Sequence, residues 1–335
     1  MLPAAELPAF QDALIAWFAR EGKDYPWRRT TDPYAILVSE LMLQQTTLAM
    51  VLSRRYFERW MEAFPDVQAL AAAPEERVLA LWEGLGYYSR ARNLQKAARA
   101  IVGRHGGVFP TSPAEVLALP GVGRYTAGAV ISFAFDAPAA LVDGNVARVL
   151  ARLFDFREEI DSTVGQKALW SWAEALVPEK GARLYNSGLM ELGQRVCTVG
   201  QPRCLLCPVR AWCRAEAPAA LPRKAPRREP VIVEETALFA CRDSHVLLQQ
   251  EKGRRRHGLW KLPAPGGRPE GRLLSTSRYV ITHHRVTLRV HEAPATIVAA
   301  DDEKWIPLAG LETLPVPSPY RKALTALLSG IPEPS

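Results

Sequence analysis

The stretch LPGVGRYTAGAV, residues 119–130, places two glycines around one valine and continues as an apolar run at helical spacing. Gly121 and Gly123 permit tight backbone geometry and would expose amide groups beside the N-terminus of the following helix. Such an arrangement binds phosphate without side-chain charge. An ordinary turn between two helices gives the same G-x-G pattern, so both interpretations stay open on these residues alone.

The charge of the chain is distributed unevenly. The net charge is +7, yet residues 1–217 carry 24 Lys and Arg against 23 Asp and Glu. Residues 218–230 carry 4 against 1, and residues 231–335 carry 14 against 11. A basic chain fits a polyanionic partner, although a merely soluble protein can have the same balance. If residues 1–217 bind DNA, local geometry must supply the contacts.

The first part of the chain has a helical pattern that extends to about residue 215. The segments ERVLALWEGL, NLQKAARAIVGRH and GRYTAGAVISFAF place apolar residues at helical spacing. At the N-terminus, the same spacing predicts an amphipathic helix with Phe10, Leu14, Trp17 and Phe18 on one face. The N-terminus lacks the pattern of a signal peptide, and no apolar run approaches the roughly 20 residues of a membrane span. We therefore expect a soluble cytoplasmic protein, associated with the nucleoid if the source is bacterial.

A composition change after this part predicts a second domain. The stretch APAALPRKAPRREP interleaves prolines with basic residues, and prolines at that frequency break helices. The segments VIVEETALFA, HVLLQQ, SRYVITHH and VTLRVHEA then predict strands, and a last helix is expected near residues 319–329. The expected organisation is an α+β, multidomain chain with a helical domain over residues 1–217, a basic Pro-rich linker over 218–230 and a small β-rich domain over 231–335.

Four cysteines lie close together near the end of the helical part. Cys197, Cys204, Cys207 and Cys213 have the spacing C-x6-C-x2-C-x5-C, whereas Cys241 lies apart. Four thiolates in such a segment bind either zinc or an iron–sulfur cluster. Zinc sites usually have two close cysteine pairs, and only one is present here. Disulfides are disfavoured without a secretory signal, and buried cysteines without a ligand are the remaining alternative.

Two carboxyl groups are candidates for acid–base chemistry. Glu40 lies in VSELMLQQTT, a mostly apolar helical stretch, where burial would raise its pKa and keep it protonated. Asp143 lies in LVDGNVARVL, where the following Gly and Asn indicate a turn or a helix start. Cleavage of a glycosidic bond needs one carboxyl as acid and one carboxylate facing the sugar cation. A solvated Glu and a capping Asp are the alternatives for these two residues.

Five segments of residues 1–215 together resemble the successive signatures of the adenine DNA glycosylase (MutY) family. They are PWR (26–28), SELMLQQT (39–46), GLGYYSRARN (84–93), LPGVGRYTAGAV (119–130) and VDGNVARV (142–149). The cysteine spacing resembles that of endonuclease III-type glycosylases. The resemblance implies an all-α helix-hairpin-helix glycosylase domain with a 4Fe–4S cluster bound by the four clustered cysteines. It also implies that Gly121 and Gly123 hold the DNA backbone.

The resemblance assigns roles to single residues. It implies that Glu40 is the acid acting on adenine N7, and that Asp143 stabilises or traps the sugar cation. Tyr125, Asn145 and Glu191 fall on family positions with supporting active-site roles. Gln45 and Tyr87 match residues that wedge into the opened duplex, which makes sense because the target base must leave the stack before chemistry. Plain core packing is the alternative for Tyr87 and Tyr88.

Tyr125 separates two enzyme hypotheses. Related glycosylases that go on to cut the strand carry a lysine in the corresponding slot of the hairpin, where its amine forms a Schiff base. A phenol cannot do this. The sequence therefore predicts base removal without efficient strand cleavage.

The C-terminal segment RRRHGLWKLPAPGG resembles the G-L-W-x-x-P region of MutY C-terminal domains, which are Nudix-like. The Nudix hydrolase box G-x5-E-x7-R-E-x2-E-E is missing, so nucleotide hydrolysis is not expected. The segment ITHHRVTLRV resembles the family loop that inspects 8-oxoguanine, usually beginning Phe-Ser-His. Here it begins Ile281-Thr282-His283, which keeps a hydroxyl and an imidazole for hydrogen bonds but lacks the aromatic ring. His283 and His284 as ordinary strand-surface residues are the alternative.

The C-terminal domain is also short. Only 17 residues separate Pro263 from Ile281, so part of the Nudix-like fold is expected to be truncated. The overall prediction is a monomeric, monofunctional glycosylase that removes adenine opposite 8-oxoguanine, or opposite guanine, in double-stranded DNA. The rivals are a bifunctional endonuclease III-like glycosylase and a catalytically silent iron–sulfur protein that only binds DNA.

Overall fold

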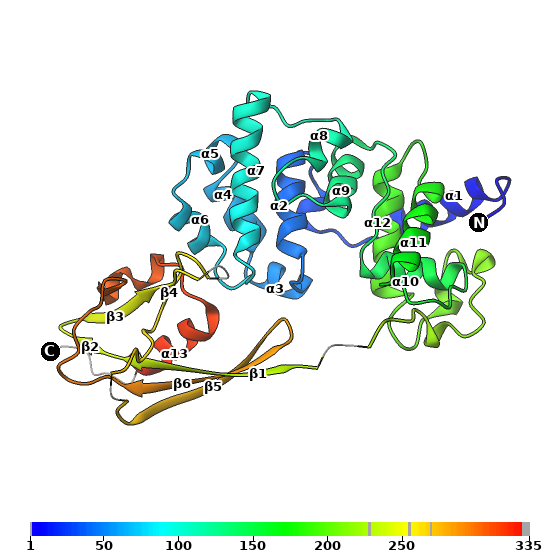
Figure 1. The fold of residues 1–335 in the computed structure, drawn as a ribbon. Coiled ribbons are helices and arrows are strands. Elements are labelled where there is room, and N and C mark those ends of the chain that lie inside the picture. The colour runs from blue at the N-terminus through cyan, green and yellow to red at the C-terminus, as the bar shows by residue number, and fades with distance from the viewer. Residues whose placement is uncertain (1, 227–228, 254–255, 269, 330–335) are drawn as a thin grey trace. The chain divides into compact units, whose positions relative to one another are not determined.

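The structure is a computed structural model that describes residues 2–226, 229–253, 256–268 and 270–329 (Figure 1). It divides into two compact units. The first unit holds residues 1–44, 61–71 and 96–226, and the second holds residues 45–60, 72–95 and 227–335. Two helical stretches of the first 217 residues thus group with the C-terminal region, while the domain boundaries at residues 217 and 230 stay a prediction.

The sequence up to the cysteine segment is helical, as predicted. Its α-helices are α1 (Leu7–Glu21), α2 (Pro33–Leu43), α3 (Leu48–Ser53), α4 (Tyr56–Ala63), α5 (Val67–Ala72), α6 (Glu75–Leu81), α7 (Ser89–His105), α8 (Pro113–Leu117), α9 (Arg124–Phe135), α10 (Gly144–Leu153), α11 (Thr163–Leu176) and α12 (Ala182–Arg195). The expected helix over residues 76–85 is shorter than predicted, because α6 ends at Leu81 and a turn with Gly84 and Gly86 at positive φ follows.

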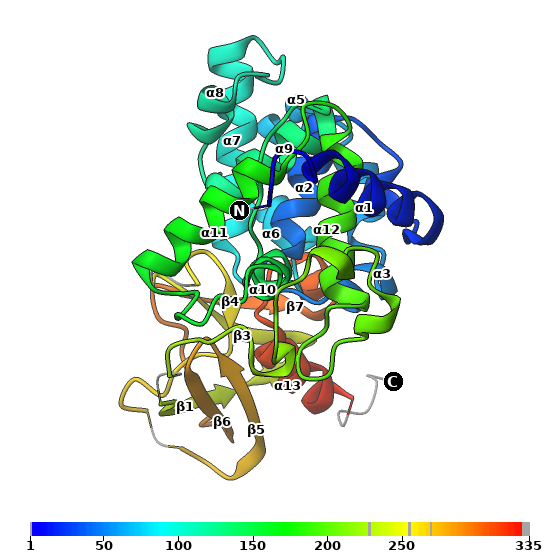
Figure 2. The ribbon, with the colours of Figure 1, turned by 90° about the vertical axis from the view of Figure 1, so that its right-hand side faces the viewer.

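The core of the first unit is built from α1, α9, α10, α11 and α12. The predicted apolar face of α1 is confirmed, since Phe10, Leu14, Trp17 and Phe18 are all buried. This face packs along α12, beside which α1 lies in Figure 2. The helix ends at Gly22, whose amide donates to the carbonyl of Phe18.

Helix α2 is buried on every side, which is the burial expected of a helix that is apolar all round. Its start is fixed by Asp32, whose side chain accepts a hydrogen bond from the amide of Tyr34, and by Pro33 at the first helical position. Within the first unit α2 packs against α9. Any polar side chain on the buried face of α2 is therefore taken out of water.

The glycine-containing stretch connects α8 to α9 as a tight helical hairpin. Gly121 has φ +78°, a backbone conformation that favours glycine, and Gly123 is the N-cap of α9. Both glycines are exposed, while Val122 between them is buried and anchors the turn. The hairpin therefore presents both glycines at the surface of the first unit, next to the exposed side chain of Arg124.

Residues 218–226 are attached to the first unit rather than running free of it. They contain a 3-10 turn, Pro218–Ala220, and an isolated bridge that pairs Arg223 with Glu159. The carbonyl of Leu221 accepts a hydrogen bond from Arg152 at 3.0 Å. The next two residues of the expected linker, 227 and 228, lie outside the described residues.

The described residues of the C-terminal region form two small sheets, a 3-10 helix (Leu308–Thr313) and an α-helix. Its elements are β1 (Val231–Phe239), β2 (Cys241–Arg242), β3 (His245–Gln250), β4 (Trp260–Lys261), β5 (Leu273–Ile281), β6 (His284–Glu292), β7 (Glu303–Pro307) and α13 (Ser318–Leu328). One sheet has the order β1-β6-β5, with β1 parallel and β5 antiparallel to β6 (Figure 1). In the other, β3 pairs with β2, β4 and β7. Apolar residues of both sheets and α13 share one core.

Across the described ranges, the structure contains no helix that is both long enough and apolar enough to cross a membrane.

Candidate active site

Glu40 is placed near the end of α2, where only 5% of the residue is exposed. Its Oε2 accepts a hydrogen bond of 2.7 Å from the hydroxyl of Tyr125, which lies in the first turn of α9. The predicted burial of Glu40 is thus confirmed. The hairpin that opens α9 also delivers the phenol that contacts this carboxyl.

The environment of Glu40 favours its protonated form. Burial raises the pKa of this carboxyl from 4.5 to about 7, and the nearby negative charge of Asp143 acts in the same direction. The hydrogen bond from Tyr125 and the positive charge of Arg28 lower the pKa, but they do not outweigh the loss of hydration. A carboxyl with a pKa near neutrality can give up a proton and take it back, which is the property of a general acid.

Asp143 is the N-cap of α10. One of its oxygens accepts hydrogen bonds from the amides of Asn145 and Val146 at 2.9 and 2.7 Å, and the other accepts from Asn145 Nδ2 at 2.9 Å. Burial raises the pKa of Asp143 above its ordinary value, and these hydrogen bonds offset only part of that rise. Asp143 therefore caps α10, while its predicted catalytic role stays a prediction. The cap leaves the carboxylate in one orientation, close enough to influence Glu40 electrostatically.

Arg148 connects Asn145, the partner of Asp143, to the segment that carries the cysteines. Its guanidinium donates to the Asn145 side chain at 2.9 Å, to the Gly193 carbonyl at 2.6 Å and to the Cys197 carbonyl at 2.8 Å. Only 8% of Arg148 is exposed. Sequence reasoning missed this residue, because an arginine within a helix usually indicates a solvated face. Its partners at 193 and 197 become neighbours only in the folded chain.

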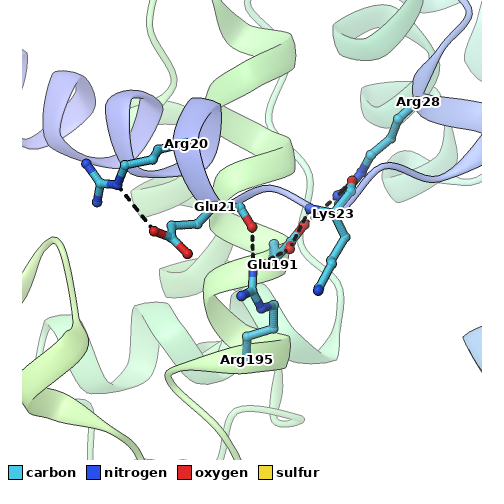
Figure 3. Close-up of polar contacts among 6 residues, drawn as sticks. All are labelled: Arg20, Glu21, Lys23, Arg28, Glu191 and Arg195. Carbon is cyan, nitrogen blue, oxygen red and sulfur yellow. Dashed lines mark hydrogen bonds and ion pairs between the residues drawn. The ribbon is translucent and has the colours of Figure 1, made fainter.

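Glu191 lies on α12 and is fully buried. Figure 3 shows its carboxylate between Arg28 and Arg195. The Arg195 pair is 2.9 Å long, and the amide of Lys23 donates to the same carboxylate at 2.9 Å. The Arg28 guanidinium also lies 5.0 and 4.7 Å from the ring centroids of Phe18 and Tyr25.

Arg28 links Glu191 to the proposed acid. Its charge acts on the pKa of Glu40, and its guanidinium pairs with Glu191. Arg28 is the last residue of the PWR motif, but the sequence pattern did not predict it as a site residue. Glu40 and Tyr125 thus form one hydrogen-bonded pair and Asp143 and Asn145 another, and the charge of Asp143 acts on Glu40. Glu191 is linked to Glu40 through Arg28, which pairs with Glu191 and whose charge acts on Glu40.

The four clustered cysteines follow α12, and the five cysteines, all within the described ranges, form no disulfide. Burial, together with the other three clustered cysteines, raises the pKa of the Cys207 thiol to about 11. Arg152 donates to Cys197 Sγ at 3.3 Å, and Cys213 Sγ donates to the Arg152 carbonyl at 3.5 Å. In the ranges that the structure describes, no three His, Cys, Asp or Glu side chains are close enough to share a single metal ion.

The buried side chain of Arg152 indicates the charge of the group that these thiols would bind. It is 1% exposed, and its Nη2 has no hydrogen-bond partner among the described residues. A buried guanidinium that donates to the Cys197 sulfur fits an anionic group bound by thiolates, because that charge would compensate the arginine.

The residues expected to contact DNA fall into two groups. Gly121 and Gly123 lie at the tip of the hairpin in the first unit. The others belong to the second unit and are all exposed: Gln45, Tyr87, Thr282 and His283. Thr282 and His283 form the turn between β5 and β6. Gln45 and Tyr87 have φ +54° and +46°, backbone conformations that are uncommon for residues other than glycine.

The chain is similar in sequence to a known family of DNA repair proteins. A family model described as "HhH-GPD superfamily base excision DNA repair protein" matches residues 38–175. The human adenine DNA glycosylase is 46% identical over 221 residues, which cover 63% of this chain and 40% of that protein. The adenine DNA glycosylase of Schizosaccharomyces pombe is 35% identical over 230 residues, covering 63% and 50%. The chain therefore spans about half the length of the curated relatives it matches.

Solved structures show the same fold for the helical part. A thermostable thymine-DNA glycosylase has a TM-score of 0.57 and 31% identity, covering 63% of this chain and 96% of that one. Endonuclease III in a trapped covalent intermediate with DNA has a TM-score of 0.52 and 27% identity, covering 64% and 97%. Fold and site together define a helix-hairpin-helix base excision DNA repair protein. Within that class, the helical part of the chain is similar to the adenine DNA glycosylases of human, Buchnera and Schizosaccharomyces pombe.

Proposed function

We propose that the protein hydrolyses the N-glycosidic bond of adenine mispaired with 8-oxoguanine, or with guanine, in double-stranded DNA. The observation that carries the proposal is the buried Glu40, with a pKa of about 7, beside the anchored carboxylate of Asp143. Adenine is a poor leaving group until its ring is protonated. A neutral acid and an anion in one site meet both needs of the reaction.

In the proposed reaction Glu40 first donates a proton and later regains one, while Asp143 acts on the sugar. Glu40 donates its proton to adenine N7, and the bond between N9 and C1′ breaks with its electrons going to the base. Asp143 faces the resulting oxocarbenium-like sugar and stabilises or traps it. Water then adds its oxygen at C1′, and its proton returns to Glu40. Asn145 and the two backbone amides hold Asp143 in place during these steps.

Tyr125 supports a monofunctional enzyme. Strand cleavage by related glycosylases requires a lysine amine in the hairpin, and the hairpin of this chain carries a phenol that instead donates to Glu40. We therefore propose base removal that leaves the sugar–phosphate strand intact. Borohydride treatment of the enzyme with its substrate should trap no covalent adduct, and robust trapping would favour the endonuclease III-like alternative.

The proposed cofactor is a 4Fe–4S cluster bound by Cys197, Cys204, Cys207 and Cys213. One support is the buried Arg152, which donates to the Cys197 sulfur. The other is that the clustered cysteines lie close enough to raise the pKa of the Cys207 thiol. When bound, the cluster would crosslink this segment and so stabilise it. Arg148, which bonds the carbonyl of Cys197 and the side chain of Asn145, would then tie a rigid segment to the Asp143 cap.

The proposed DNA contacts follow from exposure and backbone conformation. Exposed amides at the hairpin would hold a phosphate, and Gln45 and Tyr87 would wedge into the duplex. Their left-handed backbones are strained, and strain of this kind collects at functional sites. The C-terminal region from residue 231 is proposed as a truncated Nudix-like domain. Thr282 and His283, at its β5–β6 turn, would contact 8-oxoguanine.

A single-turnover excision assay tests the proposal. Duplexes carrying adenine opposite 8-oxoguanine, guanine or cytosine are incubated with the parent, with Glu40→Gln and with Asp143→Asn. The parent should release adenine fastest opposite 8-oxoguanine, and each isosteric amide should slow release at least about 100-fold without loss of DNA binding. Normal release by both variants refutes the mechanism. Binding of the mispair by the parent without any release would favour the silent DNA-binding alternative.

A further inference from the structure

The two residues proposed to wedge into DNA lie on separate turns of the second unit. Gln45 follows α2 and precedes α3, while Tyr87 ends the turn between α6 and α7. Both are exposed, and both hold positive φ. A strained backbone persists only when its surroundings determine it. A specific contact must therefore hold these turns in place.

Arg90, in the first turn of α7, makes that contact. Its Nη2 donates to the carbonyls of Leu85 and Gly86 at 2.9 and 3.1 Å, and to the Thr46 hydroxyl at 3.2 Å. Leu85 and Gly86 directly precede Tyr87, and Thr46 directly follows Gln45. One guanidinium nitrogen therefore joins the two turns.

Further contacts close the junction around Arg90. Its guanidinium lies 5.6 Å from the ring centroid of Tyr87 and 5.3 Å from that of Trp82, within range of a cation–π interaction. The Thr46 hydroxyl donates to the Leu85 carbonyl at 3.3 Å, and the Trp82 indole donates to the Gly86 carbonyl at 3.0 Å. Only 7% of Arg90 is exposed, so these bonds face little competition from water.

From these contacts we propose that Arg90 is a positioning residue that sets the spacing and direction of Gln45 and Tyr87 for extrusion of the target base. It does not touch the reacting atoms. Because one nitrogen of the Arg90 guanidinium bonds both turns, the two wedges enter the duplex as a pair rather than independently. The inference rests on the proposed glycosylase function and deepens it, since it concerns the step that precedes bond cleavage.

The test compares two duplexes that differ in the cost of opening. One carries adenine in a stable duplex opposite 8-oxoguanine. The other flanks the same adenine with further mismatches, so that the base is already poorly stacked and extrusion costs less. Arg90→Met removes the donors while keeping the apolar stem, and Arg90→Lys keeps a charge without the planar fork. Arg99→Met on the same helix serves as the matched control, because the Arg99 guanidinium donates to the Ala71 carbonyl at 3.1 Å rather than to either wedge turn.

The positioning role predicts a defect that depends on the duplex. Arg90→Met should slow single-turnover excision roughly 10- to 100-fold in the stable duplex and much less in the pre-opened one, because a small misplacement of a positioning group has effects of this size. Arg90→Lys should show the same pattern with a smaller loss. Arg99→Met should behave as the parent on both duplexes. An equal loss on both duplexes, or no loss on either, overturns the proposal.

A second readout separates this inference from the proposed function. With 2-aminopurine in place of the target adenine, the fluorescence rise on binding reports unstacking and needs no bond cleavage. The parent should give the rise, Arg90→Met and Arg90→Lys should reduce it, and Arg99→Met should retain it. If the parent unstacks the base but releases no adenine, the proposed function fails while the role of Arg90 stands. If both Arg90 variants unstack the base as the parent does, the role of Arg90 is refuted. If Arg90→Met does not fold, as a thermal melt will show, Arg90→Lys decides.

Discussion

Replacing Tyr125 with phenylalanine should move the pH dependence of adenine excision toward alkaline pH. The phenol donates a 2.7 Å hydrogen bond to Glu40, and this bond lowers the pKa of the carboxyl against the larger effect of burial. The pKa of Tyr125 itself is raised well above 10, so the phenol stays a donor throughout an ordinary assay range. Without the hydroxyl, nothing replaces the bond to the ionised carboxylate, and the protonated form of Glu40 gains.

The size of the change follows from the strength of such a bond. A hydrogen bond that favours the carboxylate by about 1.4 kcal/mol changes the protonation equilibrium tenfold, which is one pH unit. The parent, with Glu40 at a pKa of about 7, should keep about a tenth of its low-pH rate at pH 8. Tyr125→Phe should keep about half of its own low-pH rate at that pH, even if its rate is lower at every pH.

Single-turnover rates measured between pH 5.5 and 9 with saturating enzyme give the two midpoints directly. Tyr34→Phe is the control, because Tyr34 is also buried on α2 but donates its hydroxyl to the Phe64 carbonyl at 2.9 Å. That variant should keep the midpoint of the parent. A midpoint for Tyr125→Phe equal to the parent's, or more acidic, would refute the coupling between the phenol and the acid.

Three further predictions concern stability. Raising the pKa of Glu40 from 4.5 to about 7 costs the folded state about 3 kcal/mol once the carboxyl ionises, so unfolding free energy should fall as pH rises through this window. Glu40→Gln should abolish that fall in urea titrations at several pH values. Arg148→Met breaks a buried network and should lose about 3 kcal/mol, with slower excision, whereas retention of both would contradict the network. Arg321 pairs with Glu83 at 2.7 and 2.8 Å, and a double-mutant cycle of Arg321→Met with Glu83→Gln should give a coupling of about 1 kcal/mol; strict additivity would exclude it.

Local sequence patterns were enough to predict the elements that depend on near neighbours. The apolar face of α1, the glycine hairpin before α9 and most of the C-terminal strands follow from periodicity and from turn chemistry. The burial of Glu40 followed from its apolar surroundings in α2. The helix predicted over residues 76–85 was too long. Apolar spacing alone does not show that Gly84 and Gly86 adopt positive φ and form a turn after Leu81.

The amino-acid sequence alone therefore determined the local geometry. It determined where helices begin, where the backbone turns and which carboxyl is buried away from water. Only the tertiary structure decided which side chains hold the site together. Arg28 reaches Glu191, Arg148 reaches the carbonyl of Cys197, and Arg90 joins two turns that lie 39 residues apart from Thr46 to Leu85. An arginine on a helix looks like a solvated residue until folding supplies its acceptors. Because those acceptors are distant along the chain, no local pattern records them.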